Sequence, residues 1–214
     1  MKKGMLISFE GGEAAGKTTQ IKRLIKYLRE KGFDVVGTKE PGGTLVGEAI
    51  RNILLHTNFE ISSRAEALLF NASRCQLVAD VVKPSLQKGK IVVMDRYYDS
   101  TYAYEGFGGE LKQEELRPII DFAIDGSVPD VTFLLDISFD VAMKRKAADE
   151  NLKDLDRFEN KAKAYHEKVR KGFLTLAKQE PERFVVIDAS KTADEVFEII
   201  TKEVERRYKL LQGK

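Results

Sequence analysis

The chain has 214 residues, 43 % of them hydrophobic and 33 % charged, which is enough for a full core in a single domain. Its 36 basic and 34 acidic side chains nearly cancel, and a net charge of +2 gives no reason to expect a nucleic-acid or membrane partner. The single cysteine excludes an intramolecular disulfide, and no signal peptide or membrane-length apolar run is recognisable, so we expect a cytoplasmic protein.

Short apolar runs alternate with helical patterns along the chain. Strands are predicted at residues 5–9, 35–38, 91–94, 131–135 and 184–187. Helices are predicted at residues 17–31, 45–56, 63–88, 113–124, 139–148, 155–179 and 193–211. Pro84 is expected to kink or divide the longest of them. The strands are apolar throughout and connected by helices, which favours an α/β protein with a parallel sheet covered on both faces.

The first predicted strand leads into a phosphate-binding loop. Residues 11–18 read Gly-Gly-Glu-Ala-Ala-Gly-Lys-Thr, the complete G-x-x-x-x-G-K-[ST] pattern, and a helical pattern follows directly. Glycines let backbone N–H groups point at phosphate oxygens, Lys17 can reach the β- and γ-phosphates, and the Thr18 hydroxyl can ligate Mg²⁺. The start of the helix adds the positive end of its dipole. The sequence therefore predicts a nucleoside triphosphate site.

The third predicted strand ends at two more side chains suited to phosphate chemistry. Asp95 and Arg96 directly follow the apolar run 91–94. A carboxylate at the carboxyl end of a buried parallel strand lies in the crevice where open α/β sheets bind ligands, and there it can hold Mg²⁺. The Arg96 guanidinium suits a further phosphate group.

A triphosphate site alone leaves a switch GTPase, a motor ATPase and a small-molecule kinase open. The string nearest to the guanine-binding Asn-Lys-x-Asp motif, at residues 160–163, reads Asn-Lys-Ala-Lys and lacks the aspartate. A D-x-x-G switch motif is missing at the expected strand end, and the chain is short for a motor ATPase. These observations favour a kinase.

Five separated strings together resemble the thymidylate kinase family, in its bacterial form. They are Phe9-Glu10-Gly11, Glu40-Pro41-Gly42-Gly43-Thr44, Leu69-Phe70 with Arg74, Asp95-Arg96-Tyr97 with Ser100 and Ala103-Tyr104, and Asp188-Ala189-Ser190. The resemblance runs over essentially the whole chain in the family's order. It implies an α/β, three-layer P-loop kinase fold over residues 1–214, with a five-stranded parallel sheet of order 2-3-1-4-5 and helices on both faces. It also implies a homodimer, a lid at about residues 144–159, and transfer of the γ-phosphoryl group of Mg²⁺-ATP to dTMP, giving dTDP for dTTP biosynthesis.

The resemblance assigns one group of residues to dTMP. Phe70 is expected to stack on the pyrimidine, and Arg74, on the same helical face, is expected to donate to thymine O4. Tyr104 is expected to fill the space beside the ribose C2′ atom, and Arg51 and Arg96 are expected to grip the monophosphate. The residues implied for dTMP binding are Glu13, Pro41, Arg51, Phe70, Arg74, Arg96, Ser100, Thr101 and Tyr104.

A second group is implied for ATP and for catalysis. Thr18 and Asp95 are the implied metal ligands. The implied catalytic residues are Lys17, Asp95, Arg96 and the lid residue Arg157. The residues implied for ATP binding are Gly11, Gly12, Glu13, Ala14, Ala15, Gly16, Lys17, Thr18, Thr19, Arg145, Asp188, Ala189 and Ser190.

The sequence departs from the family pattern within the phosphate loop and after the Ala-Tyr pair. Ala14 stands where the eukaryotic form carries an arginine, so a lid cation, Arg145 or Arg157, is expected to replace that charge. Glu105 stands where glutamine usually follows Ala-Tyr. A kinase for another nucleotide or small metabolite stays an alternative, as does a nucleotide-binding regulatory module without turnover. The intact phosphate loop and the Asp95-Arg96 pair argue against lost turnover.

Overall fold

Five parallel strands form one sheet in the computed structural model, which describes residues 4–57, 59–148, 158 and 162–213. The sheet order is β2-β3-β1-β4-β5, as the family resemblance implied. The strands are β1 (Met5–Glu10), β2 (Val35–Lys39), β3 (Ile91–Asp95), β4 (Val131–Asp136) and β5 (Phe184–Asp188).

All five strands were predicted, and each extends one residue further at its carboxyl end than predicted. The added residues are polar, so a pattern of apolar residues does not include them. The pairing between neighbouring strands nevertheless extends to them. Phe9 of β1 lies opposite Asp95 of β3, and Lys39 of β2 pairs with the same aspartate. On the other side, Asp136 of β4 lies opposite Asp188 of β5. The carboxyl edge of the sheet therefore carries a row of charged side chains.

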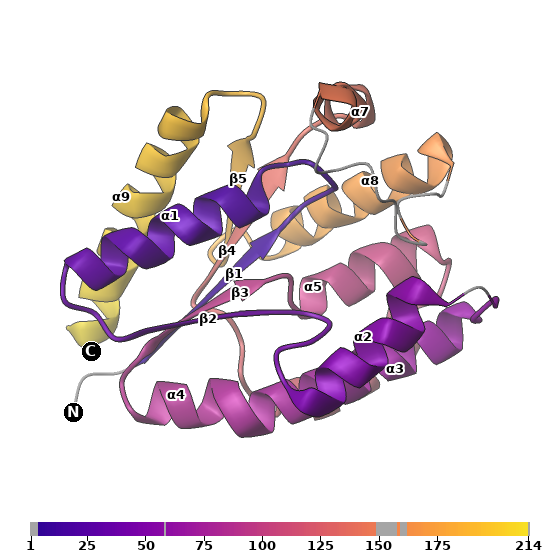
Figure 1. The fold of residues 1–214 in the computed structure, drawn as a ribbon, viewed down its shortest axis with the longest axis horizontal. Helices are drawn as coiled ribbons and strands as arrows, with labels where there is room; N and C mark the ends of the chain where they lie inside the picture. The colour runs from indigo at the N-terminus through magenta and orange to yellow at the C-terminus, as the bar shows by residue number, and fades with distance from the viewer. Residues whose placement is uncertain (1–3, 58, 149–157, 159–161, 214) are drawn as a thin grey trace.

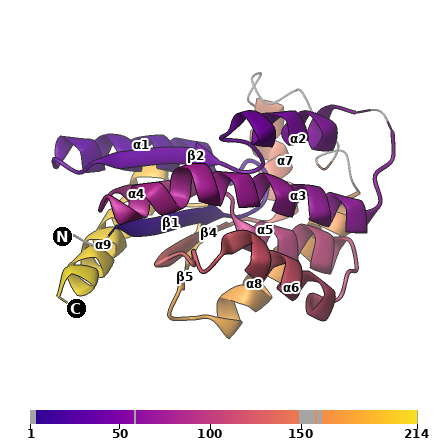
Figure 2. The ribbon, with the colours of Figure 1, turned by 90° about the horizontal axis from the view of Figure 1, so that it is seen from below.

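Helices cover both faces of this sheet (Figures 1 and 2). The helices are α1 (Lys17–Glu30), α2 (Leu45–His56), α3 (Ser63–Leu77), α4 (Lys83–Gln87), α5 (Tyr98–Thr101), α6 (Gln113–Ile124), α7 (Phe139–Ala148), α8 (Lys163–Gln179) and α9 (Ala193–Gln212). Two stretches of the described residues are π-helical: η1 (Val78–Val82) and η2 (Tyr102–Gly108). Met5, Ile7 and Phe9 of β1 pack with α1 and α9 on one face, whereas Leu6 packs with α3 and α6 on the other.

The predicted helix over residues 63–88 is divided, as Pro84 indicated. Helix α3 ends at Leu77, η1 makes one wider π turn, and α4 continues from Lys83. Proline has no N–H for the hydrogen bond to the preceding turn, and its ring crowds the carbonyl four residues earlier. The wider turn immediately before Pro84 accommodates both effects.

The helices differ from the prediction by more than one residue in two further places. Residues 98–108 are helical, as α5 followed by η2, although no helix was predicted there. This stretch is rich in Tyr and Gly, which have no strong helix preference, and tertiary contacts hold it. Helix α8 begins at Lys163 instead of residue 155, since Ala162 is extended, with φ −61° and ψ 153°. Residues 155–157 and 159–161 lie outside the described part of the chain.

A buried ion pair links α5 to the start of β5. The Arg183 guanidinium donates to both carboxylate oxygens of Asp99, at 2.7 and 2.8 Å, and to the Thr132 hydroxyl at 2.6 Å. The side chain of Asp99 is fully buried, and that of Arg183 is 8 % exposed. Glu180 accepts from the outer edge of the same guanidinium.

None of the helices in the described ranges is long and apolar enough to cross a membrane.

Breaking this ion pair should destabilise the fold. In Asp99→Ala, a buried guanidinium loses its bidentate partner, so the free energy of unfolding should fall by about 3 kcal/mol. Urea denaturation followed by circular dichroism measures the loss. As a control, Lys202→Ala removes the exposed ion pair with Glu198 and should cost less than about 0.5 kcal/mol. Equal losses in the two variants would contradict the assigned role of the buried pair.

Candidate active site

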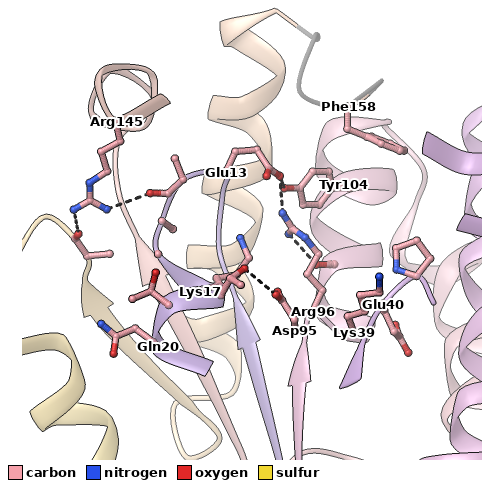
Figure 3. Close-up of a pocket in the computed structure, with 18 of the residues that line it drawn as sticks. Glu13, Lys17, Gln20, Lys39, Glu40, Asp95, Arg96, Tyr104, Arg145 and Phe158 are labelled. Carbon is pink, nitrogen blue, oxygen red and sulfur yellow. Dashed lines mark hydrogen bonds and ion pairs between the residues drawn. The ribbon is translucent and has the colours of Figure 1, made fainter. Parts of the chain in front are cut away.

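A cavity of about 730 Å³ opens at the carboxyl edge of the sheet (Figure 3). The phosphate loop and the turn after β3 form its centre. Arg145 of α7 stands at one end, and Phe70 and Arg74 of α3 line the other. One cavity therefore contains both the residues predicted for the triphosphate and those predicted for the acceptor.

The phosphate loop has the conformation that its glycines allow. Gly11 has φ 133°, and a Cβ atom there would lie 2.3 Å from the carbonyl oxygen of Leu135, so only glycine fits against β4. Lys17 begins α1 and folds back over the loop, where its ammonium group donates to the carbonyls of Gly11 and Gly12 at 3.0 and 2.7 Å. Burial lowers the pKa of Lys17, and the nearby Arg96 lowers it further.

Thr18 and Asp95 meet across β1 and β3. The Thr18 hydroxyl donates to the Asp95 carboxylate at 3.2 Å. The parallel register brings them together, because the phosphate loop leaves β1 at the level at which β3 ends. The two predicted metal ligands thus form one oxygen-rich point in the cavity, as the dashed line in Figure 3 marks.

Arg96 lies between the phosphate loop and η2. Its guanidinium donates to the carbonyl of Gly11 at 3.1 Å and to Glu13 at 2.5 Å. The hydroxyl of Tyr104 donates to the same oxygen of Glu13 at 3.0 Å, and the Arg96 guanidinium lies 5.0 Å from the centre of the Tyr104 ring. Desolvation opposes the charge of Arg96, but the neighbouring Tyr104 and the carboxylates of Glu13, Glu10 and Asp95 raise its pKa.

Arg74 is the most deeply buried cation of the cavity wall, with 1 % of the residue exposed. Two of its N–H groups donate to one oxygen of Glu40, at 2.8 and 2.6 Å. Two more reach Asn71 and Thr101, at 2.9 and 3.1 Å. Within the described residues, these contacts use four of the five N–H donors of the arginine. Burial and the charge of Arg74 oppose each other at Glu40, and burial dominates, so the pKa of Glu40 is raised.

The remaining predicted acceptor residues lie around this arginine. Pro41, Phe70, Ser100 and Thr101 line the cavity, and Arg51 lines it while donating to the carbonyl of Pro41 at 2.9 Å. The Phe70 ring lies 5.8 Å from that of Phe158, with the two planes tilted by 55°. This end of the cavity therefore combines the aromatic surface of Phe70 with two arginines, Arg51 and Arg74, whose side chains are held by hydrogen bonds.

At the opposite end, Arg145 links α7 to the phosphate loop and to the segment after β5. It donates to the carbonyl of Ala14 at 3.2 Å and to that of Ala189 at 2.6 Å. Both dashed contacts are visible in Figure 3. Its guanidinium therefore lies between the phosphate loop and the turn after β5.

Comparison with known proteins identifies the family to which a chain with this site belongs. The thymidylate kinase family model matches residues 9–200. The thymidylate kinase of Chlorobium luteolum is 43 % identical over 211 residues, which cover 96 % of this chain and 99 % of that protein. The crystal structure of thymidylate kinase from Ehrlichia chaffeensis is 36 % identical, with a TM-score of 0.71, over 86 % of this chain and 93 % of that one. The chain belongs to the thymidylate kinase family.

Most of the residues that the thymidylate kinase resemblance implied lie in or beside the cavity. Gly11 and Gly12, the first residues of the phosphate loop, do not line the cavity, and their carbonyls accept from Lys17. Two further residues predicted for ATP binding, Asp188 and Ser190, do not line the cavity either: the Asp188 carboxylate accepts from the Ser190 hydroxyl at 2.6 Å and from its N–H at 2.9 Å. Ala189 between them does line it. Asp188 ends β5, and Ala189 and Ser190 belong to the turn that follows it, in which Ala189 is buried whereas Asp188 and Ser190 are exposed.

Several polar residues of the cavity wall were not predicted from the sequence. Gln20, Lys39, Lys146 and Lys191 all line it. Gln20 is 3 % exposed and donates to the carbonyl of Ala193 at 2.8 Å, which joins α1 to α9. Its place one turn after Lys17 on the same helix was the available signal. Glu105, the departure from the family pattern, is also buried in this wall.

Proposed function

We propose that this chain transfers the γ-phosphoryl group of ATP to dTMP and so produces dTDP, a step in dTTP synthesis. As a member of the thymidylate kinase family it is an ATP-dependent phosphotransferase, which agrees with the reaction expected from the sequence. The observation that carries the proposal is the single cavity with a phosphate loop at its centre and an aromatic, arginine-lined end beside it. Such a cavity suits two nucleotides whose phosphates meet.

The donor nucleotide is proposed to occupy the phosphate loop and the Arg145 end. Backbone N–H groups of residues 11–18 and the start of α1 suit the phosphates. Lys17 would exchange its two carbonyl partners for phosphate oxygens, which are stronger acceptors because they are charged. Arg145 and Ala189 would border the adenine. Asp188 and Ser190 would act on this wall only through the conformation of Ala189.

The acceptor is proposed to occupy the opposite end. Phe70 would stack on the pyrimidine, and the remaining N–H of Arg74 would donate to thymine O4. Cytosine carries an amino group there, which would place one donor against another. Arg96 and Arg51 would hold the monophosphate, with Ser100 and Thr101 beside them. Tyr104 would occupy the space at the ribose C2′ atom, and Glu13 would face the acceptor sugar.

Mg²⁺ is proposed as the cofactor. The Thr18 hydroxyl and the Asp95 carboxylate, 3.2 Å apart, fit it, because Mg²⁺ prefers oxygen ligands and is usually held by one or two carboxylates together with substrate phosphates. The described residues hold no cluster of three or more His, Cys, Asp or Glu side chains suited to a metal ion. When bound, the ion would neutralise charge on the β- and γ-phosphate oxygens.

Catalysis is proposed to rest on alignment and charge. The attacking oxygen of dTMP is already anionic at neutral pH, so no general base is needed. Lys17, Arg96 and a lid cation would stabilise the charge of the transferring group. Arg157 and most of the predicted lid, residues 144–159, lie outside the described residues, and their role stays a prediction.

A homodimer and a cytoplasmic location are also proposed. Helix α3 packs against both α2 and α6, and all three helices carry large apolar side chains that are exposed. Exposed large apolar side chains on neighbouring helices are typical of a protein interface. They are Leu45, Val46, Ile53, Leu68 and Phe122, with exposed fractions from 41 to 94 %.

A panel of nucleoside monophosphates with Mg²⁺-ATP tests the proposed function. We expect dTMP to have the highest kcat/KM. In Arg74→Lys the charge facing Glu40 remains but the planar fork is lost, so the preference for dTMP over dCMP should fall at least about tenfold. Arg64→Lys, an exposed arginine on the same helix, is the matched control. Faster phosphorylation of dCMP or AMP by the wild type would refute the proposal.

Removing the Lys17 ammonium group tests the phosphate loop. Lys17→Met keeps the length of the stem, so the fold should persist, while kcat should fall roughly a hundredfold or more, about 3 kcal/mol of transition-state stabilisation. Lys22→Met on the exposed side of α1 should leave kcat unchanged. Near-normal turnover in the first variant would be incompatible with the assigned role.

Removing Arg145 tests the donor end. Arg145→Ala should raise the KM for ATP about tenfold, because a partly buried charged contact is lost, whereas the KM for dTMP should stay within about twofold. Steady-state kinetics with each substrate varied in turn measures both constants. Lys144→Ala, the exposed neighbour on α7, is the control. Equal effects on both substrates would place Arg145 at the wrong nucleotide.

A further inference from the structure

One carboxyl group at the centre of the molecule has no part in the proposed reaction. Glu10 is the last residue of β1, and none of it is exposed. Its carboxyl group accepts the backbone N–H of Tyr97 at 2.8 Å on one oxygen and the hydroxyl of Ser100 at 2.6 Å on the other. Both donors belong to the segment after β3, more than eighty residues away in the sequence.

These two bonds hold the segment that carries Arg96. The Arg96 backbone has φ 66°, a left-handed conformation that residues other than glycine rarely adopt, so its surroundings must impose it. Its N–H donates to the carbonyl of Phe9 at 3.0 Å, and its guanidinium donates to that of Gly11 at 3.1 Å. Glu10 lies between these two carbonyls and fixes the next peptide, at Tyr97.

Ser100 connects the same carboxyl group to the Arg96 side chain. Its hydroxyl donates to Glu10 and accepts from the guanidinium of Arg96 at 3.4 Å. Glu10 therefore constrains Arg96 twice, through the backbone of Tyr97 and through the hydroxyl of Ser100. The carbonyl of Gly11 accepts from the same guanidinium nitrogen as Ser100, Nη1, and Glu13 accepts from the other terminal nitrogen, Nη2.

The charge of Glu10 is secondary to this geometry. Burial and the nearby Asp99 raise the pKa of Glu10 to about 8, while Ser100, Arg96 and the Tyr97 N–H act in the opposite direction. Lys17 and Arg74 are the other charged groups that interact with it. What Glu10 supplies to the segment after β3 is two hydrogen bonds in fixed directions.

We infer that Glu10 is a positioning residue for the acceptor phosphate: it holds the strained Arg96 in the direction in which its guanidinium meets dTMP. The inference rests on the proposed function, in which Arg96 grips the dTMP phosphate. It assigns Glu10 no contact with either nucleotide. Its loss should therefore weaken dTMP binding and leave ATP binding almost unchanged.

A pair of substitutions separates the geometry of Glu10 from its charge. Glu10→Gln keeps the length, and its amide can accept from Tyr97 and donate to Ser100, so its KM for dTMP should stay within about threefold of wild type. Glu10→Asp keeps the carboxyl group but is too short to reach both donors. Its KM for dTMP should rise roughly ten- to a hundredfold, with the KM for ATP within about twofold.

Calorimetric titration with dTMP alone supplies a readout that does not depend on turnover, and its Kd should change in parallel with the KM. Ser8→Ala is the matched control, since it removes a buried hydrogen bond of β1, to Thr132 at 2.7 Å, outside the Arg96 contacts. It should lower the melting temperature without changing the Kd for dTMP.

The outcomes are distinct. If Glu10→Asp bound dTMP as tightly as wild type, or if Glu10→Gln were as impaired as Glu10→Asp, the positioning role would be overturned while the proposed function stood. Parallel losses for ATP and dTMP would overturn it too, because they would indicate general damage to the site. A wild type that neither bound nor phosphorylated dTMP would overturn both proposals.

Discussion

The parallel pairing of β1 with β3 and β4 is the constraint on which the rest of the site depends. The register places Phe9 beside Asp95 and Glu10 beside Leu134, so the phosphate loop, the Asp95-Arg96 turn and the start of the chain after β4 leave the sheet at one level. Gly11 then approaches the carbonyl of Leu135 so closely that no side chain fits. A slip by one residue would turn Asp95 and Glu10 to the opposite face and separate every group of the cavity.

Within that frame, the cations of the cavity are oriented by carboxylates of the same chain. Glu13 holds Arg96, and Glu40 holds Arg74. Burying these pairs has a desolvation cost that the ion pairs only partly offset. The cost is understandable at an active site, because donors that already point correctly need no reorganisation when charge develops on a substrate. Stability and function are therefore in tension at these two arginines.

The segment after β3 shows how such orientation is supported from behind. On one side Glu10 fixes Tyr97 and Ser100, and on the other Arg183 fixes Asp99. Helix α5 is only four residues long and could not persist by its own hydrogen bonds. Two buried polar clusters, reaching it from β1 and β5, hold it in place. The position of Arg96 is thus determined by three strands of the sheet.

The sequence by itself determined the five strands, their helical connections and the phosphate loop, because apolar periodicity and the glycine and lysine spacing are local patterns. The family resemblance added the sheet order and most residues of the cavity. Only the tertiary structure decided the rest. The helical turns at residues 98–108, the partners of Glu10 and Arg183, and the outward direction of Asp188 and Ser190 depend on contacts between residues far apart in the chain. A local pattern carries no information about such partners, since the hydrogen bonds of a buried polar group are made wherever the packed elements bring a matching donor or acceptor.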